Sequence, residues 1–529
     1  MKQPAEQYYR YCPGEERVRL SDAVCLGRRR ASFHKCPGCQ FNDDERGDPP
    51  FEARLVTLRS AAGLAAAKED PMLERVFKAY DVRGTVPDPL NEQVAWRIGN
   101  ATAQFLRAAL SGYDRSDPDV NRLAVGRDMR THSPALQQAF IEGAVAAGTY
   151  ALDVGLVDTP QIYFAANHLK CCGGVQTTAS HNPANYNGFK ICGPKGRPIG
   201  ADSGLKEIER IAKALSRHAV ELHGKVARVD LAEPYKRCLR RFLVDPRPMN
   251  VAVDASNGMA GRWFPILFGD VAGLKITPLN FEHTGAFVHE PNPLVAANLG
   301  QLRATVREQK AEFGACFDGD ADRCIFVDER AEIIPCDLLT ALLAGEYLRE
   351  HPGAAVVYDL RSSRIVRETI VALGGQPKRQ RVGHVFMKRA MADSNAVFGG
   401  ELSGHFYFRD FWYCDSGMLA FVAVANALTR HGRKLSELLQ PFRRYFPSGE
   451  RNFRCADKPA ALRRVEEKYA GGRIDHLDGL TVEFEDWWFN VRPSNTEPLL
   501  RLNLEADRPD LLDAKLEELA PLLGEPVEH

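Results

Sequence analysis

The sequence predicts several related α/β domains followed by a C-terminal α+β domain. The main observation is a cycle in which a short apolar run, a polar loop and a helical segment follow one another at least three times. The apolar runs, which indicate strands, cover residues 123–126, 249–254 and 354–360. This alternation is typical of mixed or mostly parallel sheets. From about Pro447 the pattern changes to closely spaced strand-like runs and a final helical segment, which indicates a different domain.

Local signals support the individual elements. Ser133 and Pro134 predict a cap and a first helical residue for a helix over 135–148. A helix is also expected over 363–373, where Gly374 follows as a stop signal. In the C-terminal part the expected strands are residues 480–484, 487–491 and 499–504.

Length and composition bound the class of protein. The chain has 529 residues, 44% of them hydrophobic, which suits a soluble protein of about three to five domains. Its 69 basic and 69 acidic residues argue against a general nucleic-acid binder. No apolar stretch reaches the roughly 18 residues of a membrane helix, and the first residues lack the apolar core of a signal peptide. We therefore expect a cytoplasmic protein with neither a nucleic-acid nor a membrane partner.

The 13 cysteines form two groups. Nine lie between Cys171 and Cys455 in apolar surroundings and are expected to be reduced core thiols. The other four crowd the first forty residues, with His34 as a substitute ligand, and predict a zinc site that staples a segment too short for a core: Cys12, Cys25, Cys36 and Cys39. An iron–sulfur cluster is less favoured, and a flexible head with free thiols is the alternative. A linker helix is expected over 51–68, and the main body from about residue 75.

The first chemical motif is Thr-Thr-Ala-Ser-His-Asn-Pro at residues 177–183. Ser180 follows an apolar run and precedes an Asn-Pro turn, so its hydroxyl is expected at a strand end that a substrate can reach. Most serines in such a setting only form a turn or cap a helix. The second motif below shifts the balance towards chemistry.

The second motif places Asp318, Asp320 and Asp322 between two apolar runs. Alternate side chains of an extended loop point the same way, so the three carboxylates can converge. Like charges so close together need a hard cation, and Mg²⁺ fits best because it shares carboxylates with phosphate oxygens. A calcium-binding EF-hand is disfavoured although Glu329 falls at its twelfth position. Arg323 occupies the sixth position, which requires glycine, and the flanking residues indicate strands.

The third motif is a glycine-bounded loop at residues 399–408. Its Glu401, Ser403 and His405 offer donors and acceptors that suit a polyol, whereas a bulged hairpin is the structural alternative.

The fourth motif covers residues 492–498, with Arg501 beyond it. An arginine beside hydroxyls and turn amides can cradle a phosphate group. The alternative is an ordinary polar turn.

In combination, and with an opening motif at residues 78–84, these stretches resemble the α-D-phosphohexomutase family, most closely its bacterial phosphomannomutase/phosphoglucomutase members. The resemblance runs from about Phe77 to the C-terminus. It implies three α/β domains of shared topology and a fourth, TBP-like domain around one cleft. With the Cys-containing N-terminal extension, the expected boundaries are 1–75, 76–227, 228–331, 332–445 and 446–529.

The resemblance also implies residue roles. Ser180 would carry the phosphoryl group and would hold one Mg²⁺ together with Asp318, Asp320 and Asp322. The reaction site would include His181, Lys190, Arg323 and His384. The sugar and its second phosphate would be bound by Tyr80, Arg83, Glu401, Ser403, His405, Arg492, Ser494, Asn495, Thr496 and Arg501.

The implied reaction interconverts hexose 1-phosphate and hexose 6-phosphate through a 1,6-bisphosphate, with glucose or mannose 1,6-bisphosphate as activator. Arg361 and Leu338 depart from the family, which often has lysine and arginine there, so an acid–base role at Arg361 is in doubt. Leu402 and the aromatic run 406–408 favour mannose or glucose over glucosamine. A catalytically inactive sugar-phosphate-binding protein is the alternative from another class. The chain is expected to be a monomer or dimer. Its N-terminal extension is interpreted as a regulatory module or a module that binds an unknown partner, with a structural cap as the alternative.

Overall fold

The computed structural model describes residues 9–11, 19–21, 71–109, 121–215, 224–494 and 498–527. The chain divides into two compact units, residues 1–54 and 55–529. In the first unit, β1 (Tyr9–Tyr11) pairs antiparallel with β2 (Arg19–Ser21). The predicted linker helix lies outside the described residues, as does the predicted zinc site of Cys12, Cys25, Cys36 and Cys39.

The first sheet of the second unit has six strands in the order β3-β7-β6-β4-β5-β8. Its strands are β3 (Val82–Thr85), β4 (Arg122–Arg127), β5 (Tyr150–Leu156), β6 (Gly173–Thr177), β7 (Tyr186–Cys192) and β8 (Lys225–Arg228). The helices of this part are α2 (Pro71–Val76), α3 (Glu92–Ala109), α4 (Ser133–Ala146), α5 (Thr159–His168) and α6 (Leu205–Ala214).

The second sheet has the order β10-β9-β11-β12 and the third the order β14-β13-β15-β16-β17. The second contains β9 (Met249–Asp254), β10 (Leu274–Leu279), β11 (Phe313–Phe317) and β12 (Cys324–Asp328), with α7 (Ala232–Arg240), α8 (Met259–Phe268) and α9 (Gly300–Glu308). The third contains β13 (Ala355–Asp359), β14 (Gln376–Gln380), β15 (Phe398–Gly400), β16 (Phe406–Phe408) and β17 (Cys414–Asp415), with α10 (Cys336–Glu350), α11 (Arg364–Ala372), α12 (His384–Asp393), α13 (Gly417–His431) and α14 (Leu435–Leu439).

These three sheets share one core topology. If the strands β4–β7, β9–β12 and β13–β16 are each counted from one to four, the spatial order is 2-1-3-4 in every case. Strands one to three are parallel and strand four is antiparallel to strand three. Strands β6, β11 and β13 are buried at every residue, as expected for parallel sheets covered on both faces. The prediction of related α/β domains is confirmed.

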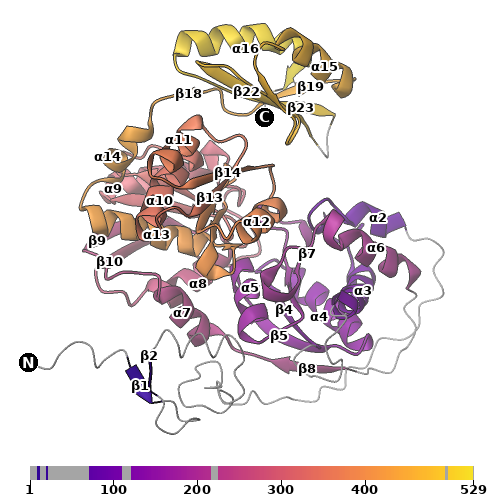
Figure 1. Ribbon diagram of the computed structural model, residues 1–529. Coiled ribbons are helices and arrows are strands. Elements are labelled where there is room, and N and C mark those ends of the chain that lie inside the picture. Colours follow the sequence, from indigo (N-terminus) through magenta and orange to yellow (C-terminus); the bar gives the residue numbers. More distant parts are fainter. Residues whose placement is uncertain are drawn as a thin grey trace, which may run out of the picture. The chain divides into compact units, whose positions relative to one another are not determined.

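The fourth sheet is antiparallel throughout, in the order β20-β21-β22-β23-β19-β24 with β18 beside β23. Helices α15 and α16 lie against one face of it (Figure 1). Their bounds and those of the strands are β18 (Phe446–Pro447), β19 (Arg451–Arg454), α15 (Lys458–Lys468), β20 (Arg473–Asp475), β21 (Leu480–Glu483), β22 (Trp487–Pro493), β23 (Leu499–Ala506), α16 (Pro509–Leu523) and β24 (Glu525–Val527). The expected C-terminal α+β domain is therefore present.

One local prediction is wrong. Ser133 does not cap α4 but is its first residue, after His132 in the cap position. Its hydroxyl instead donates a hydrogen bond to Asp128 at 2.5 Å. The serine hydroxyl binds Asp128 instead of capping the helix, because Asp128, just after β4, and Ser133, at the start of α4, are both fully buried.

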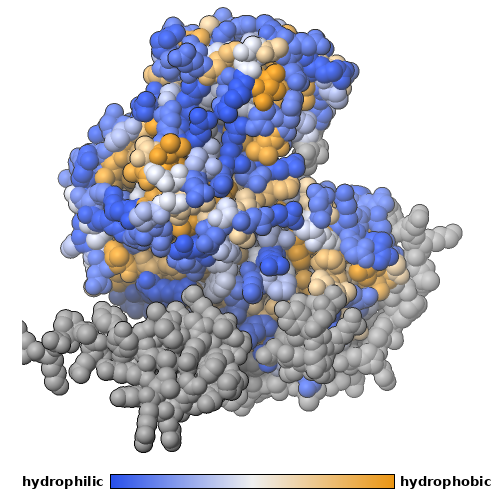
Figure 2. Space-filling model, in the orientation of Figure 1, coloured by the Kyte–Doolittle hydropathy of each residue, from blue (hydrophilic) through white to orange (hydrophobic). Residues whose placement is uncertain are grey.

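Two general expectations can be compared with the structure. The nine cysteines from Cys171 to Cys455 are free and buried, as predicted. Among the described residues, no helix is long and apolar enough to cross a membrane. The face in Figure 2 is mostly hydrophilic, with apolar residues in scattered groups.

Candidate active site

The four motifs occupy equivalent places in their sheets. In each α/β sheet the loop from strand three to strand four carries the motif: Ser180 between β6 and β7, the three aspartates between β11 and β12, and Ser403 between β15 and β16. In the fourth sheet the motif lies between β22 and β23. These hairpins follow the carboxyl end of a strand, where ligands bind in open α/β sheets.

Ser180 lies in a buried, positive-φ turn. Its φ is 51° and it is 1% exposed, and its amide donates to the Thr178 hydroxyl at 2.9 Å. The left-handed conformation is uncommon for a residue with a Cβ and is often found at functional sites. The Ser180 hydroxyl donates a 2.8 Å hydrogen bond to Oδ2 of Asp318, and His181 Nδ1 lies 3.4 Å from Oγ. The first and second motifs, 138 residues apart in the sequence, therefore meet at this serine.

The close approach of these two loops explains a glycine in the second motif. A Cβ at Gly319 would lie 2.4 Å from the carbonyl oxygen of Ser180, inside any normal contact distance. Thr159, at the start of α5, adds a second link because its hydroxyl donates to Oδ2 of Asp320 at 2.5 Å. Loops from the first and second sheets are thus packed backbone to backbone.

The three aspartates form a buried carboxylate cluster. One oxygen from each of Asp318, Asp320 and Asp322 lies within 4.8 Å of the others, and the residues are 0%, 0% and 2% exposed. Burial, followed by the charges of Asp320 and Asp322, raises the pKa of Asp318 well above its usual range. Lys190 Nζ lies 2.7 Å from Asp320 Oδ2 and also contacts Asp322. Burial works against the charged form of Asp322, but Lys190 and His405 outweigh it and lower the pKa of that carboxyl.

This cluster fits a divalent cation. Its ligand atoms are carboxylate oxygens only, and Oδ1 of Asp320 is buried without a hydrogen-bond partner. Hard cations such as Mg²⁺ prefer this set of oxygen ligands. A second group, Asp322, His405 and Asp415, fits a hard cation less well, because one of its three ligands would be the imidazole of His405, whose pKa is raised to about 9. The strands on both sides of the aspartates exclude the helix–loop–helix arrangement of an EF-hand.

The third motif contacts the second through the backbone. Arg323 and His405 form an isolated antiparallel bridge. Ser403 Oγ lies 2.9 Å from His405 Nδ1, and His405 Nε2 lies 3.4 Å from Asp322 Oδ1. Glu401 is 1% exposed and accepts hydrogen bonds from the Tyr407 hydroxyl at 2.5 Å and the Gly383 amide at 2.9 Å. Ser403 and His405 line the cavity described below, whereas Glu401 lies behind them.

Three histidines near this junction differ in charge. Burial, aided by Arg323, lowers the pKa of His181 well below its usual value. Burial, aided by Lys388, does the same for His384. For His405 burial is outweighed by Asp322 and Glu401, which raise the pKa to about 9. Neighbouring groups whose pKa values are pushed apart are typical of acid–base chemistry.

The fourth motif supplies arginines. Arg492 at the end of β22 and Arg501 in β23 both point to the carboxylate of Glu450, at 2.8 and 3.1 Å. Arg361, which follows β13, reaches the same carboxylate at 3.4 Å. Asn495 and Thr496 lie outside the described residues.

Residues of all four motifs line one cavity of about 1120 Å³. Among the residues that the structure describes, arginine and lysine greatly outnumber carboxylates along its wall, which suits an anionic ligand. The predicted residues that line it are Tyr80, Arg83, His181, Lys190, Arg323, His384, Ser403, His405, Arg492, Ser494 and Arg501. Ser180 and the aspartates do not line it, but the aspartates contact Lys190 and Arg323, which do.

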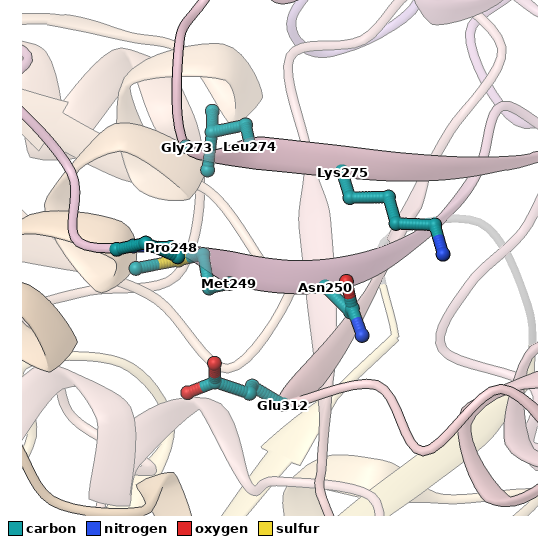
Figure 3. Close-up of a pocket in the computed structure, with 7 residues that line it drawn as sticks. All are labelled: Pro248, Met249, Asn250, Gly273, Leu274, Lys275 and Glu312. Atoms are coloured by element: carbon teal, nitrogen blue, oxygen red, sulfur yellow. The ribbon is translucent and has the colours of Figure 1, made fainter.

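A second hollow, of about 440 Å³, lies at the opposite end of the second sheet (Figure 3). Its wall is formed where β9 and β10 begin, together with Glu312 just before β11. The side-chain ends of Lys275 and Glu312 point to different sides, so no polar groups converge there. It does not resemble a binding site.

Sequence reasoning missed Arg130. This buried guanidinium donates to four carbonyl oxygens of the Ser180 loop, those of Ser180 (2.9 Å), Asn182 (2.6 Å), Pro183 (2.6 Å) and Tyr186 (3.1 Å). Its Nε is held by Asp128 at 3.2 Å. The available signal was a charged Asp-x-Arg directly after an apolar strand.

The two sequence features that favour mannose or glucose lie in different places. The aromatic run Phe406, Tyr407 and Phe408 forms β16 and is 0%, 0% and 3% exposed, so it packs in the core and does not line the cavity. Leu402 does line the cavity. Of the two features used to distinguish sugars, only Leu402 can contact one.

Comparisons with known proteins agree with this arrangement. Models of the phosphoglucomutase/phosphomannomutase α/β/α domains I, II and III match residues 74–219, 234–331 and 336–445, and the model of the C-terminal domain matches 450–522. The chain belongs to the phosphoglucomutase/phosphomannomutase family. It is a phosphohexomutase, an enzyme that transfers phosphate within a sugar.

This chain aligns with individual relatives over almost the whole length of each relative. The chain is 38% identical over 465 residues to a phosphomannomutase of Salmonella montevideo, covering 85% of this chain and 98% of that one. Phosphohexose mutases of Xanthomonas campestris are 39% identical, with coverage of 84% and 98%. A crystal structure of a phosphoglucomutase/phosphomannomutase family protein from Burkholderia thailandensis superposes with a TM-score of 0.75 at 31% identity, covering 85% of this chain and 99% of that one.

Proposed function

We propose that this phosphohexomutase interconverts the 1- and 6-phosphates of mannose and glucose, with Ser180 as the phosphoryl carrier. The observation that carries the proposal is the 2.8 Å hydrogen bond from Ser180 Oγ to Asp318. It joins the serine hydroxyl to the carboxylate cluster, beside His181, Lys190 and Arg323 of a basic cavity that is large enough for a sugar bisphosphate.

The residues fit Mg²⁺ at this point. Asp318, Asp320, Asp322 and an oxygen on Ser180 would hold the ion, which when bound offsets negative charge on the phosphoryl group. Lys190 and Arg323 line the cavity beside the cluster and are placed to neutralise the equatorial oxygens of the group in transfer.

The reaction consists of two matching transfers. In the first, the bond between phosphorus and Ser180 Oγ breaks while the free hydroxyl oxygen of the hexose phosphate bonds to phosphorus, giving a 1,6-bisphosphate. After the sugar turns around, its other phosphate returns to Ser180 and the isomeric hexose phosphate is left. A remote phosphate site must therefore accept either end of the sugar, and Arg492, Ser494 and Arg501 are our candidates for it.

As the sugar hydroxyl bonds to phosphorus it loses a proton, and the departing Ser180 oxygen gains one; in the second transfer the Ser180 hydroxyl loses that proton again. His181 and His384 both line the cavity, and their lowered pKa values make them neutral imidazoles that can accept it at pH 7. Arg361 replaces the lysine that many relatives have and is held by Asp359 at 2.8 Å, so its contribution is charge alone.

Turnover of individual sugars tests the proposal. Mannose 1-phosphate and glucose 1-phosphate are each supplied with Mg²⁺ and catalytic glucose 1,6-bisphosphate in a coupled assay, beside glucosamine 1-phosphate. We expect the first two to be converted with higher kcat/KM than the third. A higher kcat/KM for glucosamine 1-phosphate would instead assign the enzyme to amino sugars, and no turnover of any of the three would refute the proposal.

Removal of divalent cations gives a second prediction. With excess chelator, turnover should fall at least about 100-fold, because the buried carboxylates then repel the incoming phosphate. Added Mg²⁺ should restore it, whereas Na⁺ at equal ionic strength should not. Full activity in chelator would show that the cluster works without a metal. The N-terminal zinc site stays a prediction, which metal analysis of the purified protein tests.

A further inference from the structure

The carboxylate of Glu450 lies where a phosphate group is expected. Oε2 accepts from Arg492 at 2.8 Å and from Arg361 at 3.4 Å, while Oε1 accepts from Arg501 at 3.1 Å. All four residues line the large cavity. Arginine binds carboxylates and phosphates in the same way, through pairs of N–H groups that point to two oxygens. Glu450 thus presents two oxygens as a phosphate would.

The charge of this cluster also points to an anion. Three guanidinium groups face the two carboxylates of Glu450 and Asp359, so guanidinium groups outnumber these carboxylates where a phosphate monoester, of charge roughly −1.5 to −2 at pH 7, would bind. Burial disfavours the carboxylate form of Glu450, but Arg492, Arg361 and Arg501 outweigh it and lower its pKa, so it stays ionised. In addition, Nε of Arg492 is buried without a hydrogen-bond partner. The site therefore holds an internal anion yet keeps donor capacity and positive charge for another.

The position of Glu450 in the fold explains how it reaches the site. It lies between β18 and β19, at the start of the fourth sheet, and immediately precedes β19. Arg361 belongs to the third sheet and is held in place by Asp359, whereas Arg492 and Arg501 belong to the fourth. Glu450 consequently joins arginines from two sheets, which no single strand could bring together.

We propose that Glu450 sets the affinity of the phosphate site. Its carboxylate occupies the site formed by Arg361, Arg492 and Arg501 and competes there with the non-reacting phosphate of the substrate. This rests on the proposed function, because the bisphosphate must release this site and turn around between the two transfers. An arginine site without a competing carboxylate would hold either phosphate more tightly and would slow that release. Glu450 sets the affinity low enough for both ends of the sugar to exchange.

The test compares Glu450→Gln with the wild-type enzyme and with Glu450→Asp. Calorimetric titration with inorganic phosphate should give about tenfold tighter binding for Glu450→Gln, as expected from removing a close charge. In turnover, KM for the hexose phosphate should fall and kcat should fall with it. Glu450→Asp keeps the charge and should remain close to wild type. Glu467→Gln, an exposed glutamate on α15, is the matched control and should change nothing.

Two outcomes separate this role from a merely structural one. If Glu450 only orients Arg492 and Arg501, its loss should weaken phosphate binding and raise KM. Weaker or unchanged phosphate binding by Glu450→Gln would therefore overturn the inference. The phosphate titration needs no turnover, so it decides this point even if no hexose phosphate is a substrate. Matching thermal unfolding curves for the variants would show that folding is not the cause.

Discussion

Replacing Ser180 by alanine should lower the turnover of hexose phosphates by at least about 1,000-fold, as expected when a covalent carrier is lost. The substitution removes the oxygen that bonds to phosphorus and the hydrogen bond to Asp318. The residual rate in the coupled assay measures this effect.

A matched serine controls for the change in side chain. Ser394, whose hydroxyl donates to the Ala390 carbonyl at the end of α12, lies outside the cavity wall, and Ser394→Ala should keep full turnover. Hexose phosphate binding by Ser180→Ala should survive, because the arginines of the fourth motif are untouched. If Ser180→Ala turns over at the wild-type rate, the serine has no role in the chemistry.

Replacing Arg130 by methionine should cost stability and activity together. The change leaves four carbonyl oxygens of the Ser180 loop and the Asp128 carboxylate without their buried partner. Breaking one side of a buried charged pair costs about 3–5 kcal/mol. Because the same loop holds Ser180 in its left-handed turn, we also expect turnover to fall at least about 100-fold. Thermal unfolding and the coupled assay measure the two effects.

An exposed arginine serves as the comparison for Arg130. Arg210 on α6 is paired with Glu207 and is 69% exposed, so the thermal unfolding curve of Arg210→Met should stay close to that of the wild type. Arg130→Lys retains the charge, but a single ammonium group cannot donate to all four carbonyls as the guanidinium does. Its stability and turnover should therefore lie between those of the wild type and of Arg130→Met. An Arg130→Met enzyme as stable and active as the wild type would show that the loop keeps its shape unaided.

Much of this architecture could be predicted from the sequence because its signals are local. The strand runs and the four motifs each lie within about ten residues, and every motif occupies one hairpin loop. The family resemblance implied that the three α/β domains share one topology, but the 2-1-3-4 strand order itself was not predicted, because the sequence pattern does not give strand order. The convergence of the loops was expected from chemistry, because three aspartates need a cation and a phosphorylated serine needs one too.

Arg130 and Glu450 could not be predicted in this way. Arg130 binds backbone carbonyls about fifty residues away, and a backbone carbonyl leaves no trace in the residue type. Glu450 is one of many glutamates in the chain, and its partners lie 42, 51 and 89 residues away.

Phosphate transfer to the serine tests the central claim most directly. The dephosphorylated enzyme is incubated with Mg²⁺ and glucose 1,6-bisphosphate labelled with radioactive phosphorus on both phosphates, and the labelled peptide is sequenced. We predict about one label for each protein molecule, on Ser180 alone, none in Ser180→Ala, and loss of the label when unlabelled hexose phosphate is added. Label on another residue, or a labelled Ser180 that hexose phosphate cannot discharge, would contradict the account.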